Sequence, residues 1–450
     1  MSYCIENKNL IHQIVKPSTS LLHTESERGY FPTEKMAHLP MDIVNDLFLR
    51  LPASSLVRFR VLSKPCFSLI DSPDFVASHL NRTLETGDHV MVLLRSPRLL
   101  RTVYLDAPDK VSEVPHPLQA GGFTEVFGSC NGLVGLMNSP VDMALFNPST
   151  RKTHRLPIAP IDFPDHLITP EFVLYGLGYD SVHEDYKVVR ILQCKKVEAD
   201  DLVDHEIKVF SLKRNSWKRV KLLFEVQILF VYFYYHVLYR RGNGVQVGNC
   251  LHWILPRRHG VIAFNMIIRF DLASEELGTA GYPEKLFCED NMDICALDGC
   301  LCAMGYHEFT HVDVWIKRES WSKLLKVTKP ESVASLDFMR PLLYSKDRSK
   351  VLLEINIGKL VWFDLESKSF QTLGVKGCDD GSWSAEIVVS SLVLGCKGDP
   401  RRAREDKRMQ KIQGIQTEVM SKADELRSLN LHQGAGVGGE EVASSNVIKS

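Results

Sequence analysis

Four cysteines are the first residues whose type could do chemistry, because thiolates bind metal ions. They lie close together in the sequence, whereas the other cysteines among the eleven are scattered and none forms a Cys-x-x-Cys pair. Structural zinc sites use two ligand pairs, each separated by about two to four residues, and this group contains only one such interval, between Cys295 and Cys300. Small buried residues in strands explain these cysteines better, so we predict no metal and no cofactor. The four are Cys288, Cys295, Cys300 and Cys302.

Nucleophilic chemistry is not indicated either. The sequence contains no Gly-x-Ser-x-Gly elbow, no Walker loop and no His-Glu-x-x-His motif. Asp180, Ser181 and His183 have the residue types of a catalytic triad, but a triad is assembled in space, and adjacent residues of this kind usually form a turn. Cys66 has no neighbouring basic residue that would activate its thiol. We therefore predict no catalytic residue and a protein that is not an enzyme.

Composition narrows the class of protein. A chain of 450 residues is long enough for two or three domains, and 44% hydrophobic with 24% charged residues is typical of a globular protein. The net charge of −1 gives no overall field that would attract nucleic acid or a membrane, so we predict neither as a partner. Scattered cysteines without a signal peptide at the start indicate reduced thiols, which predicts a cytoplasmic or nuclear location.

Residues 38–82 contain the densest pattern of helix signals. Ser54 or Ser55 is placed to cap a second helix and Ser63 a third, while Ser72-Pro73 is a break before a short fourth helix. Three or four helices in about 45 residues form a small core, which is marginal alone and often docks on another domain. A simple helical cap on a larger domain fits equally well. The first helix is predicted from apolar residues at Ile43, Val44, Leu47, Phe48 and Leu51.

From about residue 85 the pattern changes to strands, and one unit recurs. An apolar strand runs into a polar turn, and a second strand follows. Repeats of about 40–50 residues in an all-β chain predict propeller blades, and the longer intervals leave room for insertions or for another blade. We interpret the apolar run 222–239 as a buried strand pair rather than a membrane helix, because charged and polar residues interrupt it. The equivalent positions are Phe146, Phe210, Phe270, Val314 and Phe363, spaced by 64, 60, 44 and 49 residues.

Particular motifs carry a family resemblance. The segments Leu39-Pro40, Arg50-Leu51-Pro52, Arg58-Phe59-Arg60 and Ser63-Lys64 resemble the F-box, and Ser72-Pro73-Asp74-Phe75 resembles the extension that follows it in a subfamily common in plants. The later segments Gly128-Ser129-Cys130-Asn131-Gly132-Leu133, Asn147-Pro148-Ser149-Thr150, Tyr175-Gly176-Leu177-Gly178-Tyr179-Asp180-Ser181 and Leu251-His252-Trp253 resemble the F-box-associated, kelch-like domain. Together the two resemblances cover residues 38 to about 395, in the order that the family has.

The resemblance implies that the helices dock to the Skp-family adaptor of cullin–RING ubiquitin ligases. Apolar helix packing would make this contact. Two residues differ from the family pattern, since Cys66 stands where tryptophan is usual and a proline at position 65 is unusual. The adaptor-binding residues implied are Leu39, Pro40, Ile43, Leu47, Leu51, Pro52, Leu56, Val61 and Cys66.

We therefore predict a mainly β protein with a small α domain, in which an N-terminal three-helix F-box-like module precedes a kelch-like β-propeller. The domains expected are a disordered extension (1–35), the helical module (36–84), the propeller (85–396) and a charged, partly helical to disordered tail (397–450). The function implied is that of a substrate-recognition subunit of an SCF-type ligase, bridging the adaptor and an unknown target protein. One alternative is a propeller that binds a small molecule or glycan, with the helices as an inert cap. Another is a receptor whose adaptor contact has decayed.

Overall fold

The computed structural model describes residues 40–394, with internal gaps. The predicted extension 1–35, the tail 397–450, the apolar run 222–239, Leu39 and Cys288 all lie outside the described residues. The gaps are 97–98, 119–123, 163–167, 197–202, 222–242, 260–261, 287–291, 332–334, 357 and 376–382.

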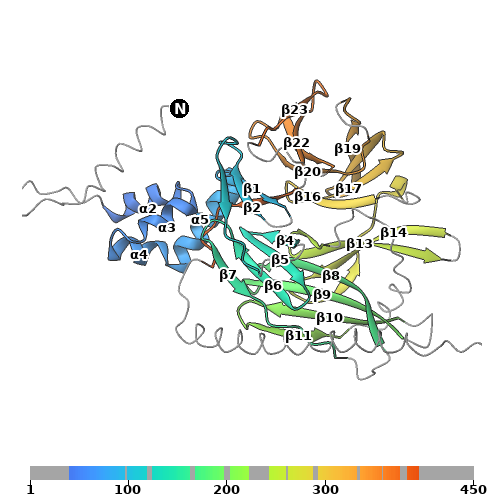
Figure 1. The fold of residues 1–450 in the computed structure, drawn as a ribbon, viewed down its shortest axis with the longest axis horizontal. Helices are drawn as coiled ribbons and strands as arrows, with labels where there is room; N and C mark the ends of the chain where they lie inside the picture. The colour runs from blue at the N-terminus through green and yellow to red at the C-terminus, as the bar shows by residue number, and fades with distance from the viewer. Residues whose placement is uncertain are drawn as a thin grey trace, which may run out of the picture.

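The N-terminal helical module contains four helices within the described residues, which are the three of the predicted F-box-like module and the predicted fourth (Figure 1). Ser63 caps α4 as expected, and Ser72, predicted as part of a break, caps α5; each accepts a hydrogen bond from a backbone N–H three residues later. Ser54 and Ser55 lie inside α3 instead, because Pro52 with its fixed φ of −63° already occupies the N-cap position. The helix that was expected to be short is the longest, at 14 residues. The bounds are α2 Met41–Leu49, α3 Ala53–Phe59, α4 Lys64–Ile70 and α5 Pro73–Thr86.

Six four-stranded antiparallel sheets follow and form the blades of a β-propeller. Blade 1 has the order β24 (Ser384–Val389), β1 (Val90–Arg95), β2 (Leu100–Tyr104), β3 (Val111–Val114). Blade 2 contains β4 (Glu125–Cys130), β5 (Leu133–Ser139), β6 (Asp142–Asn147) and β7 (Lys152–Arg155). Blade 3 contains β8 (Ile168–Asp180), β9 (Asp185–Lys196), β10 (Val203–Ser211) and β11 (Ser216–Val220).

Blades 4 to 6 repeat the same order, and a short 3-10 helix, η2 (Glu284–Leu286), lies between blades 4 and 5. Blade 4 contains β12 (Val245–Val247), β13 (Cys250–His259), β14 (Ile262–Asp271) and β15 (Leu277–Thr279). Blade 5 contains β16 (Met292–Leu297), β17 (Cys300–His307), β18 (His311–Lys317) and β19 (Trp321–Thr328). Blade 6 contains β20 (Met339–Tyr344), β21 (Lys350–Ile355), β22 (Lys359–Asp364) and β23 (Phe370–Thr372).

The repeat read from the sequence is confirmed at the level of single strands. Its five equivalent positions all lie on third strands, in blades 2 to 6. Each side chain is at most 2% exposed and belongs to an apolar cluster between neighbouring blades. Blade 1 was not visible because its first strand comes from residues 384–389 and the other three from residues 90–114. This pairing of the two ends of the domain closes the ring.

Polar residues after strands set the turns. Asn131 and Gly132 join β4 to β5 with φ of 51° and 84°, which is the pair of left-handed residues that a two-residue type I′ hairpin requires. Asn147, Asp271 and Asp364 end third strands, and the Oδ1 of each accepts two hydrogen bonds from backbone N–H groups of the turn. The same turn chemistry is therefore used in three blades.

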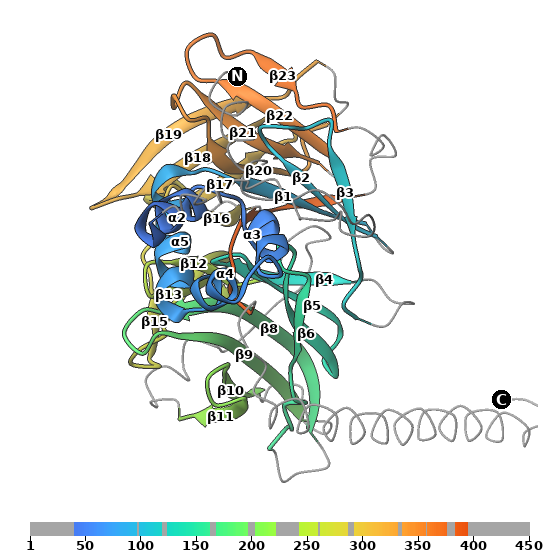
Figure 2. The ribbon, with the colours of Figure 1, turned by 90° about the vertical axis from the view of Figure 1, so that its left-hand side faces the viewer.

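The helical module covers one face of the propeller. In Figure 2 the four helices lie in front, and the blades fan out around them. Since α5 leads directly into β1, and Val90 pairs with Val389 at the end of β24, this face also contains the hairpins between first and second strands. Lys346, in the β20–β21 hairpin, forms an ion pair of 2.6 Å with Asp88 at the end of the module. The hairpins between second and third strands consequently lie on the opposite face.

Candidate functional site

The helical module displays large apolar side chains to solvent. Val61 is 86% exposed, and four others are between 39% and 47% exposed. They come from α2, from α4 and from the connection between α3 and α4. Exposed apolar residues gathered in one small domain are typical of a surface that binds another protein. We define the exposed apolar surface of the module as Met41, Ile43, Val61, Leu62 and Phe67.

The predicted adaptor-binding residues divide into three groups. Pro40, Ile43 and Val61 are exposed, whereas Leu47, Leu51, Pro52 and Cys66 are half-buried. Leu56 is 0% exposed and is a core residue of the module. Its predicted role as a direct anchor therefore does not fit this structure, because the helical period shows which residues share a face but not what covers that face.

Three residues of the exposed apolar surface were not among the predicted adaptor-binding residues. Met41, Leu62 and Phe67 are 47%, 45% and 39% exposed. Phe67 lies beneath the guanidinium of Arg60, which is 5.1 Å from the ring centroid, while Arg60 also forms an ion pair of 2.6 Å with Asp71. Val61 and Leu62 lie between α3 and α4, in a connection too short to fold back into the core. This short connection is the sequence feature from which the exposure of the two side chains could have been predicted.

A buried histidine connects α5 to the chain between α2 and α3. His79 is fully buried, and its Nε2 lies 2.8 Å from the carbonyl oxygen of Leu51. Burial lowers the pKa of His79 below its usual 6.5, and this outweighs the opposite effect of the Leu51 carbonyl. The neutral ring therefore helps to hold the residues on which the exposed apolar surface is built.

The segment that follows β24 joins the helical module to the propeller. The backbone N–H of Ala53 donates to the Oγ of Ser390 at 2.9 Å, and the side chain of Leu392, 2% exposed, packs in the core of the module. From the other side, the Asn147 amide of blade 2 donates to the carbonyl oxygen of Ser391 at 3.1 Å. This segment, residues 390–394, is thus shared by both parts, and it fixes the exposed apolar surface relative to the blades.

The turn interpretation of the triad-like residues is confirmed. Asp180 is buried, and its Oδ1 accepts hydrogen bonds from the backbone N–H groups of Val182 and His183 at 3.0 and 3.2 Å. Burial alone would raise the pKa of Asp180, but hydrogen bonds from Lys187 and His183 lower it to about 2. The hydroxyl of Ser181 is directed to Asn249 at 3.3 Å. Asp180 therefore shapes a turn.

The described cysteines of the predicted strand group are Cys295, Cys300 and Cys302. Cys295 and Cys302 are register partners on β16 and β17, and both are buried. A hydrogen bond with Cys302, together with burial, raises the pKa of the Cys295 thiol well above its usual value. A buried thiol of high pKa is a poor nucleophile and metal ligand. Across the described residues, moreover, no helix has the length and apolar character needed to cross a membrane.

Comparison with known families agrees with this architecture. The F-box domain matches residues 36–78, and the F-box associated beta propeller domain matches residues 105–385. The chain therefore belongs to the F-box proteins that have an F-box associated propeller.

Individual relatives extend over most of the chain. The F-box protein At4g22390 of Arabidopsis thaliana is 64% identical over 380 residues, covering 83% of this chain and 94% of the relative. The F-box protein CPR1 of the same organism is 57% identical over 397 residues, covering 86% of this chain and 96% of the relative. The F-box/kelch-repeat protein At3g23880 of Arabidopsis thaliana is more distant, at 27% identity over 376 residues, 78% of this chain and 96% of the relative.

Proposed function

We propose that this protein is a substrate-recognition subunit of an SCF-type cullin–RING ubiquitin ligase. The helical module binds a Skp-family adaptor through its exposed apolar surface, and the propeller holds a target protein. Ubiquitin transfer is performed by other subunits. The observation that carries the proposal is an exposed apolar surface on an F-box domain that is fixed to a propeller by shared core residues. Holding a target at a set distance from the ubiquitin donor raises the effective concentration of the two reactants.

The topology favours one face of the propeller for the target. The helical module already occupies the face with the hairpins between first and second strands. The opposite face contains the hairpins between second and third strands and the connections from blade to blade. Loops on a rigid scaffold are the usual place for binding residues. We therefore assign target binding to the face opposite the module.

Val61→Asp tests the adaptor contact. Val61 is 86% exposed, so a carboxylate there leaves the core intact, but it becomes buried and unpaired if an adaptor covers it. We expect affinity for the adaptor to fall at least tenfold, measured by calorimetry on the full chain, while the circular dichroism spectrum is unchanged. Ile43→Asp, on α2, should have the same effect.

Val182→Asp is the matched control, because Val182 is also an exposed valine, at 68%, but lies in a turn of blade 3. Its adaptor affinity should equal that of the unaltered protein. Full affinity in both Val61→Asp and Ile43→Asp would contradict the proposal. It would favour the alternative, a propeller that binds a small molecule or glycan, with the helices as an inert cap.

A further inference from the structure

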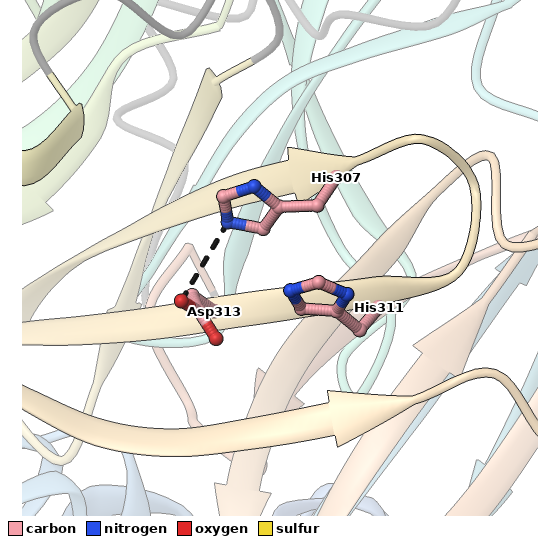
Figure 3. A group of neighbouring side chains, drawn as sticks. All are labelled: His307, His311 and Asp313. Atoms are coloured by element: carbon pink, nitrogen blue, oxygen red, sulfur yellow. Dashed lines mark ion pairs between the residues drawn. The ribbon is translucent and has the colours of Figure 1, made fainter.

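The hairpin between β17 and β18 of blade 5 brings two histidines and an aspartate together. His307 ends β17, His311 begins β18, and the two are register partners across a turn of three residues. Asp313 is two residues further along β18, opposite Gly305. Because side chains alternate along a strand, all three residues lie on the same face of the sheet. Figure 3 shows the two rings side by side, with the carboxylate of Asp313 near the end of the His307 ring.

The distances suit a single small cation. One ligand atom from each residue can be chosen so that all three lie within 4.8 Å of one another. The Nε2 of His307 is 3.6 Å from the nearer carboxylate oxygen of Asp313, Oδ2, so the imidazole and the carboxylate can both reach one ion. The two imidazole rings are stacked, with their centroids 4.5 Å apart.

The hydrogen bonds of His311 and Asp313 leave ligand atoms for a cation. The hydroxyl of Thr310 lies 3.1 Å from the Nδ1 of His311, so the second ring nitrogen of His311 is left for other contacts. The Oδ1 of Asp313 is buried and has no hydrogen-bond partner among the described residues. The Oδ2 of the same carboxylate accepts a hydrogen bond from Lys323 at 2.7 Å. Ligating carboxylates are commonly oriented by such a hydrogen bond on their other oxygen.

We propose that His307, His311 and Asp313 form a zinc-binding site. Two imidazoles and one carboxylate are a donor set that Zn²⁺ accepts, and three protein ligands leave a fourth position for water. Lys323 has two roles. It orients the carboxylate, but it is also a positive charge that opposes the cation, and its 42% exposed side chain can turn into solvent when zinc binds.

A bound ion would stabilise an unusual turn. Glu308 and Phe309 have φ of 44° and 59°, in the left-handed region that residues with a Cβ rarely adopt. Phe309 is 59% exposed and lies on the face opposite the helical module. Since the three ligands stand at both ends of the turn, zinc would clamp the hairpin and fix the position of this aromatic side chain.

The first test measures binding of zinc alone to the full chain, purified with a chelator and then dialysed free of it. Calorimetry should detect one site that His311→Ala weakens at least tenfold, and Asp313→Asn should weaken it as well. The control is His183→Ala, which removes an exposed histidine that is paired with Asp180 at 2.7 Å but belongs to no group of three possible metal ligands among the described residues. This variant should bind zinc as the unaltered protein does.

Two further measurements make the test independent of folding defects. Lys323→Gln keeps all three ligands and removes the competing charge, so it should bind zinc several-fold more tightly. Cobalt in place of zinc should give a spectrum without thiolate charge-transfer bands, since none of the ligands is a cysteine. Thiolate bands, or affinity that is the same in all the variants, would overturn the proposal, as would the absence of binding to the unaltered protein.

Discussion

Cys66 stands where the resemblance to the F-box predicts a tryptophan. It is half-buried on α4, and its backbone N–H donates to the capping Oγ of Ser63 at 3.2 Å. Truncating a buried tryptophan typically costs ~3–5 kcal/mol, and a residual deficit of ~1.4 kcal/mol corresponds to a tenfold change in an equilibrium constant. We predict that Cys66→Trp raises adaptor affinity, or the stability of the helical module, about tenfold.

Calorimetry and thermal melts on the full chain would separate the two effects. Cys66→Ala is the control, because it removes the thiol without adding apolar area, and it should give no gain. If Cys66→Trp weakens both binding and stability, the site has been repacked around Pro65 and Phe67. In that case the neighbouring residues already compensate for the missing tryptophan.

Single residues show what the sequence could and could not predict. The resemblance to the F-box implied that Leu56 and Val61 both contact the adaptor, but the two differ completely in exposure, at 0% and 86%. Leu56 belongs to the core of the helical module, and Leu392 joins this core from a segment more than 300 residues away. His307, His311 and Asp313 were missed because the search for metal ligands considered the cysteines, whereas the hairpin register that unites these three residues is visible only in the structure.

At the scale of single elements, we predict that His79 on α5 makes the stability of the folded protein depend on pH. Its folded pKa lies below 6.5, so the unfolded chain binds more protons in the range just below pH 6.5. The contribution of the neutral ring to stability is therefore complete above pH 6.5 and declines as the pH falls toward the folded pKa, by up to about 1.4 kcal/mol per pH unit.

Melting temperatures of the full chain between about pH 7.5 and 5.5 would test this dependence. His79→Gln, which can still donate to the Leu51 carbonyl, should have a shallower dependence on pH than the unaltered protein. Burial lowers the pKa of His252 to about 4, and this residue contributes equally to the pH dependence of both proteins. The difference between their two slopes therefore reports on His79 alone. Identical slopes would show that His79 does not contribute.

Helices and strands were predicted correctly where neighbouring residues in the sequence determine them. Ser63 was recognised as a cap, Ser72-Pro73 was recognised as a break before a helix, and the five repeat positions were found on the third strands of five blades. The start of α3 was wrong because a proline, rather than a serine, occupies the N-cap. Blade 1 could not be found from a repeat, since β24 joins β1 only when the ring is closed. Local periodicity contains no information on such a long-range pairing.

At the scale of the whole molecule, a buried charge network holds the ring closed between blades 6 and 1. Arg340 on β20 lies 3.0 Å from Glu354 and 3.5 Å from Glu386 on the closing strand, and it also donates to the carbonyl oxygen of Ala385. Glu354 is 1% exposed. Removing one partner of a buried ion pair costs ~3–5 kcal/mol, because the other charge is left uncompensated.

We therefore predict that Arg340→Met lowers the free energy of unfolding by ~3–5 kcal/mol, measured by denaturant titration of the full chain. Adding Glu354→Gln should recover part of the loss, because glutamine still accepts from the Ala385 N–H, which lies 2.9 Å from the Glu354 Oε1, without a buried charge. A loss below about 1 kcal/mol in the single variant would show that the network is not needed for closure.

The shared segment 390–394 has a consequence for the order in which the protein is made. Translation proceeds from the N-terminus, so the helical module leaves the ribosome several hundred residues before Leu392 exists to complete its core. The nascent chain likewise exposes the edge of β1 that β24 later covers. A chain that stops early would contain an F-box with an unfinished core. Completion of the F-box is thus tied to completion of the propeller, and under the proposed function a prematurely ended product would be a poor competitor for the adaptor.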